Sequence, residues 1–283
     1  MGISPLTRMS RAVSAHVLAS FVSALMLTSF SPLLQGVAPA LAPPVALAQE
    51  VPCAPTDENL LAYWKLDESS GSTAADAVGS SHGTHIGGPT PDPDEPDPIA
   101  FDDPNSLIFD GVDDAVDMGD VLNMGTSDWS TSLWFKTSDD DGSLIAKSRY
   151  AAGGGRWFTA FENGTIKAGM APNGSTVLVS TSAVPYLDND WHHIATVYDR
   201  DGSITLYIDG TAVGSADISD HSAVDMQSSD HLMIGHYQDQ TGTAPHPNTL
   251  IFEGFLDDVR VYDKVLSQDE IDSLYAGECE YST

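Results

Sequence analysis

The chain has 283 residues, in which 41 Asp and Glu residues outnumber 11 Lys and Arg residues, so its formal net charge is −30 at pH 7. A field of that sign repels nucleic acids and anionic lipid surfaces and attracts cations, which excludes nucleic-acid binding as the function. Once the N-terminal leader described below is subtracted, the remaining length fits one large domain.

Residues 1–48 have the composition of a secretion signal. Arg8 and Arg11 precede a mostly apolar stretch over 17–34, and Ala46-Leu47-Ala48 has the small-residue pattern of a cleavage site. A retained membrane anchor is the alternative, because the apolar stretch approaches the length of a bilayer span, although several prolines occur at its end and beyond it. We expect cleavage, no membrane span after it, a lead-in over 49–59, and a secreted or cell-envelope location.

The sequence after the leader predicts antiparallel β-structure. From Trp191 to Gly210, two β-rich runs are joined by Asp201-Gly202 and followed by Asp209-Gly210. Asp-Gly favours hairpin turns, because both central residues of such a turn need positive φ. We expect strands over 60–66, 107–109, 115–118, 131–136, 143–147, 156–161, 165–170, 175–180, 194–198, 203–208, 231–235 and 255–262, with a short strand after Gly210. Short strands separated by glycine turns predict a β-sandwich.

One short helix is expected at the C-terminal end. Ser267-Gln-Asp-Glu270 has the pattern of a capping box, in which each end residue accepts a backbone amide of the other. Ile271, Leu274 and Tyr275 then form an apolar stripe, and Gly277 is a suitable stop. The stripe predicts a helix that packs on the sandwich.

Pro89 to Asp103 is rich in proline and aspartate. Proline lacks the amide that a strand ladder needs, so the segment is expected to be extended, exposed and unpaired. It is either a tolerated insertion or a weak cation site.

Two cysteines, Cys53 and Cys279, lie near the two ends of the mature chain. Export to an oxidising compartment favours a disulfide between them, and two free thiols are the alternative. Closing so long a loop would stabilise the fold by roughly 5 kcal/mol in the chain-entropy treatment.

Five motifs occur in the order typical of one known family. They are Ala62–Gly71, Ala75–Gly79 with His82-Gly83, Leu107–Asp114, Trp191–Ile194 with Leu206–Gly210, and Gly254–Tyr262. Over residues 60–277, which leave a tail at 278–283, the chain resembles the laminin-G-like, concanavalin A-like jelly-roll domains of exported proteins. The resemblance implies an all-β antiparallel sandwich with a short C-terminal helix, but it does not specify a ligand.

The resemblance also implies a structural calcium ion that ties the closing strand to the first loops. Strict alternation places Asp257 on the face of Phe255 and Val259, and a carboxylate on a core face must be paired or metal-bound. Asp76 is the matching loop carboxylate, and backbone carbonyls near His82 would complete an oxygen-ligand site. The alternative is that Asp257 accepts backbone amides as an ordinary buried acceptor.

For function, the resemblance implies an exported, non-catalytic recognition module that binds carbohydrate or acts in adhesion, with a glycan or a cell-envelope protein as partner. Sugar sites combine an aromatic platform with polar groups at its edge. The candidates are Arg149, Tyr150, Arg156, Trp157, His236 and Tyr237, unless Trp157 belongs to the core. The alternatives are a structural or protein-interaction domain without a sugar site, and a glycoside hydrolase. We find no strand with the alternating carboxylates of related hydrolases and expect no catalytic residue.

Overall fold

A computed structural model describes residues 59–99, 101–148, 155–172, 176–181, 185–237 and 250–277. The chain separates into two compact units, 1–49 and 50–283, and the described residues all belong to the second. The predicted signal sequence, Cys53, Cys279, Arg149 and Tyr150 lie outside the described residues, so what the sequence predicts for them stays a prediction. Within the described ranges, no helix is long and apolar enough to cross a membrane.

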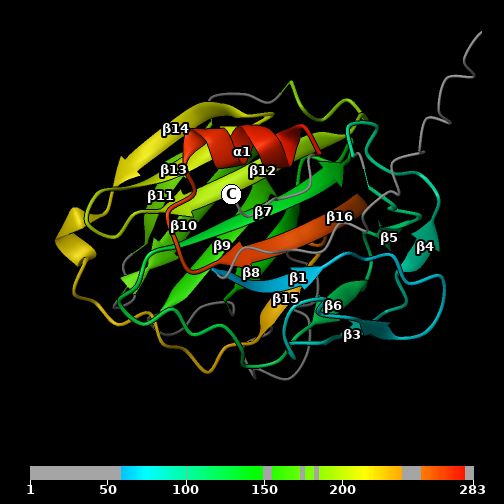
Figure 1. Ribbon diagram of the computed structural model, residues 1–283, viewed down its shortest axis with the longest axis horizontal. Coiled ribbons are helices and arrows are strands. Elements are labelled where there is room, and N and C mark those ends of the chain that lie inside the picture. The colour runs from blue at the N-terminus through cyan, green and yellow to red at the C-terminus, as the bar shows by residue number, and fades with distance from the viewer. Residues whose placement is uncertain are drawn as a thin grey trace, which may run out of the picture. The chain divides into compact units, whose positions relative to one another are not determined.

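The described residues form two antiparallel sheets, which confirms the predicted sandwich (Figure 1). Sheet A has the order β14-β13-β12-β7-β16-β5-β4, and β1 pairs with β16 beside this path. Its strands are β1 (Leu60–Trp64), β4 (Thr90–Asp92), β5 (Ser106–Asp110), β7 (Trp129–Lys136), β12 (His192–Tyr198), β13 (Ser203–Ile208), β14 (Thr211–Asp217) and β16 (Glu253–Tyr262). The first and last strands of the chain are therefore neighbours in sheet A.

Sheet B has the order β11-β10-β9-β8-β15-β6-β3-β2. Its strands are β2 (Thr73–Ala74), β3 (Gly83–Ile86), β6 (Ala115–Asp117), β8 (Gly142–Lys147), β9 (Arg156–Glu162), β10 (Thr165–Ala171), β11 (Val177–Ser180) and β15 (Leu232–Ile234). The turn between β9 and β10 is Asn163-Gly164, and both residues have the positive φ that a two-residue hairpin turn requires. A single 3₁₀ turn, η2 (Ser219–His221), follows β14.

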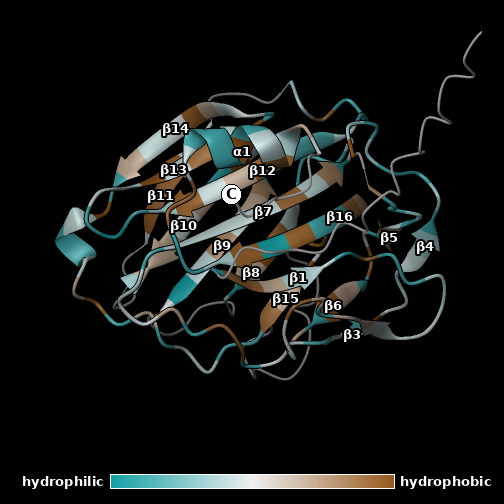
Figure 2. Cartoon of the chain, in the orientation of Figure 1, coloured by the Kyte–Doolittle hydropathy of each residue, from teal (hydrophilic) through white to brown (hydrophobic). Residues whose placement is uncertain are grey.

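The main core lies between the two sheets. It includes Trp64, Phe135 and Leu206 from sheet A and Trp157 and Phe161 from sheet B, all of them buried. Figure 2 shows apolar colour concentrated along the strands and hydrophilic colour along many of the loops. Burying large side chains of this kind stabilises the fold by about 1.5–3 kcal/mol each.

A second apolar cluster covers the outer face of sheet A, the face turned away from the main core. Helix α1 (Gln268–Tyr275) packs there through Ile271 and Leu274 against Tyr63 and Tyr262, and Figure 1 shows it in front of β12 and β13. The capping box of Ser267 with Glu270 is formed, and Gly277 follows the helix with a φ of 64°. The predicted helix and its docking face are therefore confirmed.

The Pro/Asp-rich segment differs from its prediction. Thr90–Asp92 forms β4 and pairs with β5, although Pro91 lies in the middle of it. The pairing is possible because β4 is an edge strand of sheet A. The side of Pro91 that lacks an amide hydrogen therefore faces no further strand. The segment is thus anchored to the sheet at its start.

Candidate functional site

Asp257 does not lie on the core face where the sequence placed it, because β16 contains a β-bulge. The register between β16 and β7 shifts between Asp257 and Arg260, and Asp258 has a φ of 51°. Leu256 and Val259 both face the main core, so Asp257, opposite Trp134, faces the outer side of sheet A with Trp134 and α1. The strict alternation assumed from the sequence fails because a bulge inserts one extra residue.

Four aspartates meet on this outer face, and we call them the buried acidic group: Asp67, Asp103, Asp257 and Asp258. Asp258 is well satisfied, because it accepts hydrogen bonds from the Tyr63 hydroxyl and, at 3.2 Å, from the Arg260 guanidinium. The Arg260 guanidinium also lies 4.2 Å from the centre of the Tyr63 ring and donates to its hydroxyl oxygen at 2.9 Å. The Asp258 charge is thus balanced by Arg260.

The other three carboxylates are less well satisfied. Asp67 pairs with Lys65 at 3.6 Å, but its Oδ1 has no hydrogen-bond partner. Asp257 is 0% exposed, and although its Oδ1 accepts the Asp258 amide, its Oδ2 has no partner. Asp103 is 4% exposed, and its oxygens accept from no N–H or hydroxyl donor, but its carboxyl group is within hydrogen-bonding reach of the Asp67 carboxyl group. A buried acceptor without a donor costs about 1–3 kcal/mol, and more when it is charged.

Burial raises the pKa values in this group most, and repulsion between the carboxylates raises them further. Burial first, and then the charge of Asp258, raise the pKa of Asp103 to about 9. Burial, with the charges of Asp258, Asp103 and Asp67, also raises the pKa of Asp257. Burial raises the pKa of Asp67, although a side-chain hydrogen bond with Asp103 and then the charge of Lys65 oppose this shift. Each carboxyl group therefore favours a proton or a cation nearby.

Asp76 and His82 lie on the other side of β1. Asp76 forms an isolated β-bridge with Trp64 of β1, and the opposite edge of β1 pairs with β16. The Asp76 carboxylate accepts backbone amides of Tyr63, Val78, Gly79 and Ser81, and the Asp76 amide donates to His82 Nδ1 at 3.0 Å. The Asp76 carboxylate therefore organises its own loop, and its oxygens are already engaged with backbone donors.

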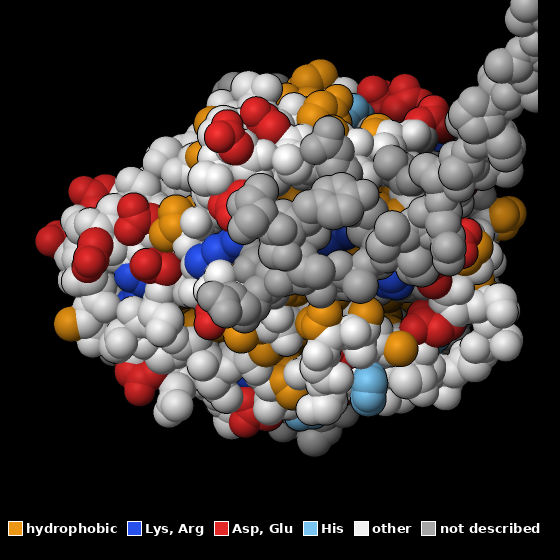
Figure 3. Space-filling view, viewed as in Figure 1, with side chains coloured by type: hydrophobic (Ala, Val, Ile, Leu, Met, Phe, Trp, Pro, Cys, Tyr) orange, Lys and Arg blue, Asp and Glu red, His pale blue; other side chains and the backbone are white. Residues whose placement is uncertain are grey.

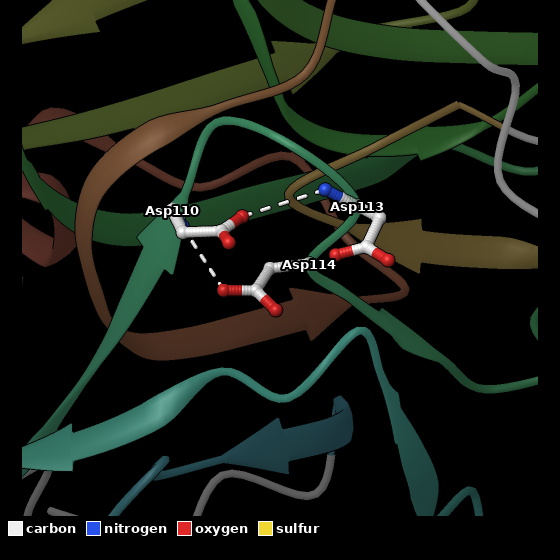
Figure 4. Close-up of side chains that lie close together, drawn as sticks. All are labelled: Asp110, Asp113 and Asp114. Atoms are coloured by element: carbon white, nitrogen blue, oxygen red, sulfur yellow. Dashed lines mark hydrogen bonds between the residues drawn. The ribbon is translucent and has the colours of Figure 1, made fainter.

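A second acidic group forms the turn between β5 and β6, and we call Asp110, Asp113 and Asp114 the acidic turn (Figure 4). One oxygen from each lies within 4.8 Å of the others, and no other set of three in the described residues meets that criterion. Asp110 accepts the amides of Val112 and Asp113, and Asp114 accepts the Asp110 amide at 3.0 Å. Burial raises the pKa of Asp114 to about 6.

A cleft of about 480 Å³ opens beside the acidic turn, where the ends of β5 and β7 meet the start of β16. We call it the strand-end cleft, and it is lined by Ile108, Phe109, Asp110, Thr137, Ser138, Asp139, Asn189, Glu253, Gly254 and Phe255. The half-buried Phe255 ring contacts Trp191 edge-on at 5.9 Å, and Lys136 Nζ lies 5.2 Å from its centre. An aromatic ring among polar side chains is the combination expected of a sugar site.

Of the four sequence-predicted ligand residues that the structure describes, Arg156 and Trp157 lie in β9 of sheet B, and His236 and Tyr237 follow β15. Trp157 is fully buried in the main core, where it offers a ligand no surface. His236 and Tyr237 are also buried, and Tyr237 packs edge-on against Phe158. Arg156 is half-buried at the start of β9. None of these four lines the strand-end cleft.

Sequence reasoning missed Asp67, Asp103 and the strand-end cleft. Asp103 and Asp257 are far apart along the chain, and the bulge that turns Asp257 outward leaves no pattern in the local sequence. The Phe109-Asp-Gly motif did mark the end of β5, where the cleft lies.

Comparison with known families identifies the class of protein. The sequence model of a laminin G family, described as the concanavalin A-like lectin/glucanases superfamily, matches residues 110–272, which is more than half of the chain. The chain therefore belongs to this family, as the motifs predicted. A search of curated proteins finds no match.

Solved structures share the fold at low sequence identity. The binding domain of Paraclostridial Mosquitocidal Protein 1 is 15% identical with a TM-score of 0.60, over 77% of this chain and 52% of that one. The botulinum neurotoxin serotype D binding domain is 17% identical with a TM-score of 0.55, over 77% and 51%. The serotype D ligand-binding domain in complex with N-acetylneuraminic acid is 16% identical with a TM-score of 0.53, over 77% and 51%. The chain spans about half the length of these structures.

Proposed function

We propose that the chain is an exported, non-catalytic recognition module that binds glycans at the strand-end cleft. The observation that carries this proposal is the cleft itself, in which the Phe255 ring stands among hydroxyl, amide and carboxylate side chains. A sugar ring stacks on an aromatic face while its hydroxyls bond to such groups. The family and the binding domains that share the fold support a recognition role.

Glycan-array binding of the chain and of Phe255→Ala tests this proposal. We expect the parent chain to bind a restricted set of glycans, and Phe255→Ala to lose at least about tenfold in affinity, because one stacking contact and its buried area disappear. Phe158→Ala, a half-buried phenylalanine on the outer face of sheet B, is the matched control and should bind normally. Loss with Phe158→Ala alone would place the site on sheet B and contradict the proposal.

A structural or protein-interaction domain is the second candidate. The observation in its favour is the acidic surface: Asp and Glu side chains are spread over the face visible in Figure 3, and the net charge of −30 suits a basic partner. A blank glycan array, together with capture of a basic cell-envelope protein that is released by about 0.5 M salt, would favour this candidate.

The strand-end cleft also contains the carboxylates of Asp110, Asp139 and Glu253. Glycoside hydrolases need a pair of carboxyl groups across the scissile bond. Release of reducing ends from a polysaccharide panel, abolished by Glu253→Gln, would therefore replace the binding role with catalysis. We expect no release.

A further inference from the structure

The strand-end cleft carries negative charge without a compensating cation. Its lining includes the carboxylates of Asp110, Asp139 and Glu253, and no Lys, Arg or His. The ion pairs formed within the described residues all involve other carboxylates. Backbone amides donate hydrogen bonds to Asp110, but they do not neutralise its charge. The cleft therefore presents three uncompensated negative charges to a ligand.

Two of these carboxylates are direct neighbours across a strand pair. Asp110 of β5 and Glu253 of β16 are register partners, so their side chains lie side by side on one face of sheet A. Like charges placed directly opposite each other destabilise a strand pair. Phe255 lies two residues further along β16, before the bulge, so its ring is on the same face as Glu253. A cationic group bound beside the ring would relieve the repulsion between Asp110 and Glu253.

Two basic side chains near the cleft are already engaged by aspartates. Lys136, which contacts the Phe255 ring, pairs with Asp94 at 2.6 Å. His192 follows the loop of Asn189 and pairs with two aspartates, at 2.8 Å and 3.2 Å. Neither side chain is therefore left to bind the carboxylate of an acidic sugar.

Further aspartates lie in the three loops that contribute to the lining. They are Asp113 and Asp114 in the acidic turn, Asp140 and Asp141 after Asp139, and Asp188 and Asp190 on either side of Asn189. Figure 4 shows the carboxylates of the acidic turn together. A cleft lined by one sign of charge raises the local concentration of ligands of the opposite sign. A cationic ligand is therefore attracted to the strand-end cleft, and an anionic ligand is repelled.

Amino groups bind such a lining better than hydroxyl groups do. A neutral sugar can donate its hydroxyls to a carboxylate, but a protonated amine donates charge-assisted hydrogen bonds, which are about twice as strong. The carboxylate of a sialic or uronic acid would instead need an Arg or Lys donor. The lining thus favours an amino sugar over a neutral sugar, and a neutral sugar over an acidic one.

We propose that the strand-end cleft binds glycans with free, protonated amino groups, such as oligomers of glucosamine. The sugar ring stacks on Phe255, and its ammonium group binds the neighbouring carboxylates of Asp110 and Glu253. This inference rests on the proposed function, since it names the class of glycan that the same cleft takes.

Calorimetric titration with three tetrasaccharides, in the presence of chelator, tests this specificity. The tetramers of glucosamine, N-acetylglucosamine and galacturonic acid are equal in length but cationic, neutral and anionic. Near pH 6, where the amine is protonated, we expect the glucosamine tetramer to bind at least about tenfold more tightly than the acetylated one, and the acidic one not to bind. Raising the salt from about 0.05 M to about 0.5 M should weaken binding of the glucosamine tetramer at least about fivefold and leave the acetylated one unchanged.

Glu253→Gln and Asp110→Asn should each remove most of the preference for the amine, because each takes away one charged partner of the ammonium group. We expect affinity for the glucosamine tetramer to fall at least about fivefold, with a change below about twofold for the acetylated one. Asp220→Asn is the matched control, since it removes the same charge from an exposed residue in η2, next to β14 at the other edge of sheet A. It should leave binding unchanged, and circular dichroism shows whether each variant is folded.

Equal or tighter binding of the acetylated or acidic tetramer, lost in Phe255→Ala, would overturn this inference and leave the proposed function in place. If none of the three tetramers binds, the inference is overturned, and the glycan array decides the proposed function separately. A lysine tetrapeptide that binds as tightly as the glucosamine tetramer, or an equal loss in Asp220→Asn, would show a response to charge alone and would also overturn it.

Discussion

The two acidic groups of this chain differ in how their charges are satisfied. The acidic turn brings three carboxylates within 4.8 Å, yet backbone amides and solvent satisfy them locally. The buried acidic group is assembled from β16 and two segments far from it in sequence, and it leaves three buried oxygens of Asp103 and Asp257 without an N–H or hydroxyl donor. Carboxylates can therefore lie close together and still be satisfied, whereas burial away from donors leaves them unsatisfied.

The largest effect is expected at Arg260, which neutralises the satisfied half of the buried acidic group. Arg260→Met leaves Asp258 buried without its cation, so the free energy of unfolding should fall by about 3–5 kcal/mol. Urea denaturation measures this change. Lys65→Met, at a more exposed pair, is the control and should cost about 0.5 kcal/mol. A loss below about 1 kcal/mol for Arg260→Met would contradict this division of the group.

The raised pKa of Asp114 predicts how the stability contributed by the acidic turn changes with pH. Burial raises the pKa of Asp114 to about 6 in the folded chain, from an ordinary value of 3.8. The folded state therefore binds this proton more tightly than the unfolded state, so the stabilisation is present below about pH 3.8 and is lost as pH rises to about 6. Asp114→Asn should raise stability by about 1 kcal/mol at pH 7 and leave it unchanged near pH 4, because water screens much of the full effect. Thermal unfolding at the two pH values measures the difference.

Asp113→Asn is the control for Asp114, since Asp113 is exposed. It should change stability by less than about 0.5 kcal/mol at either pH. If Asp114→Asn lowered stability at pH 7, the Asp114 carboxylate would be well satisfied in the folded chain, and its raised pKa would be wrong.

The smallest effect is expected at His192, which forms partly exposed pairs with Asp209 and Asp188 outside both acidic groups. Burial lowers the pKa of His192, but Asp209 at 2.8 Å and Asp188 at 3.2 Å outweigh it, so the pKa is raised above its usual value. The stabilisation is complete below about pH 6.5 and is lost as pH rises through the raised pKa. His192→Gln should therefore cost about 0.5 kcal/mol more at pH 5.5 than at pH 9 in urea denaturation. An equal cost at both pH values would show that the pair contributes no charge interaction.

Local sequence predicted most of the fold, because its signals are short-range. The Asp209-Gly210 turn and the capping box of Ser267 and Glu270 depend on neighbouring residues and were predicted correctly. Asp201-Gly202 does join β12 to β13, but neither residue has the positive φ that was expected. β4 was missed, because Pro91 argues against a strand unless the strand is known to lie at an edge.

The candidate site was less predictable, because it depends on contacts between distant segments. Asp257 was predicted from its strand, but the bulge places its side chain on the opposite face of the sheet. No local sequence pattern indicates that it lies near Asp67 or Asp103. Asp76 matches the family motif in sequence, yet its oxygens are occupied by amides of its own loop and of Tyr63. The strand-end cleft likewise forms only when β5, β7 and β16 are side by side.

The most direct measurement is a crystal structure of the chain soaked with the glycan that binds most tightly on the array. Our account predicts electron density for a sugar ring stacked on Phe255 in the strand-end cleft. Density for the sugar on sheet B, or none in the strand-end cleft, would contradict it.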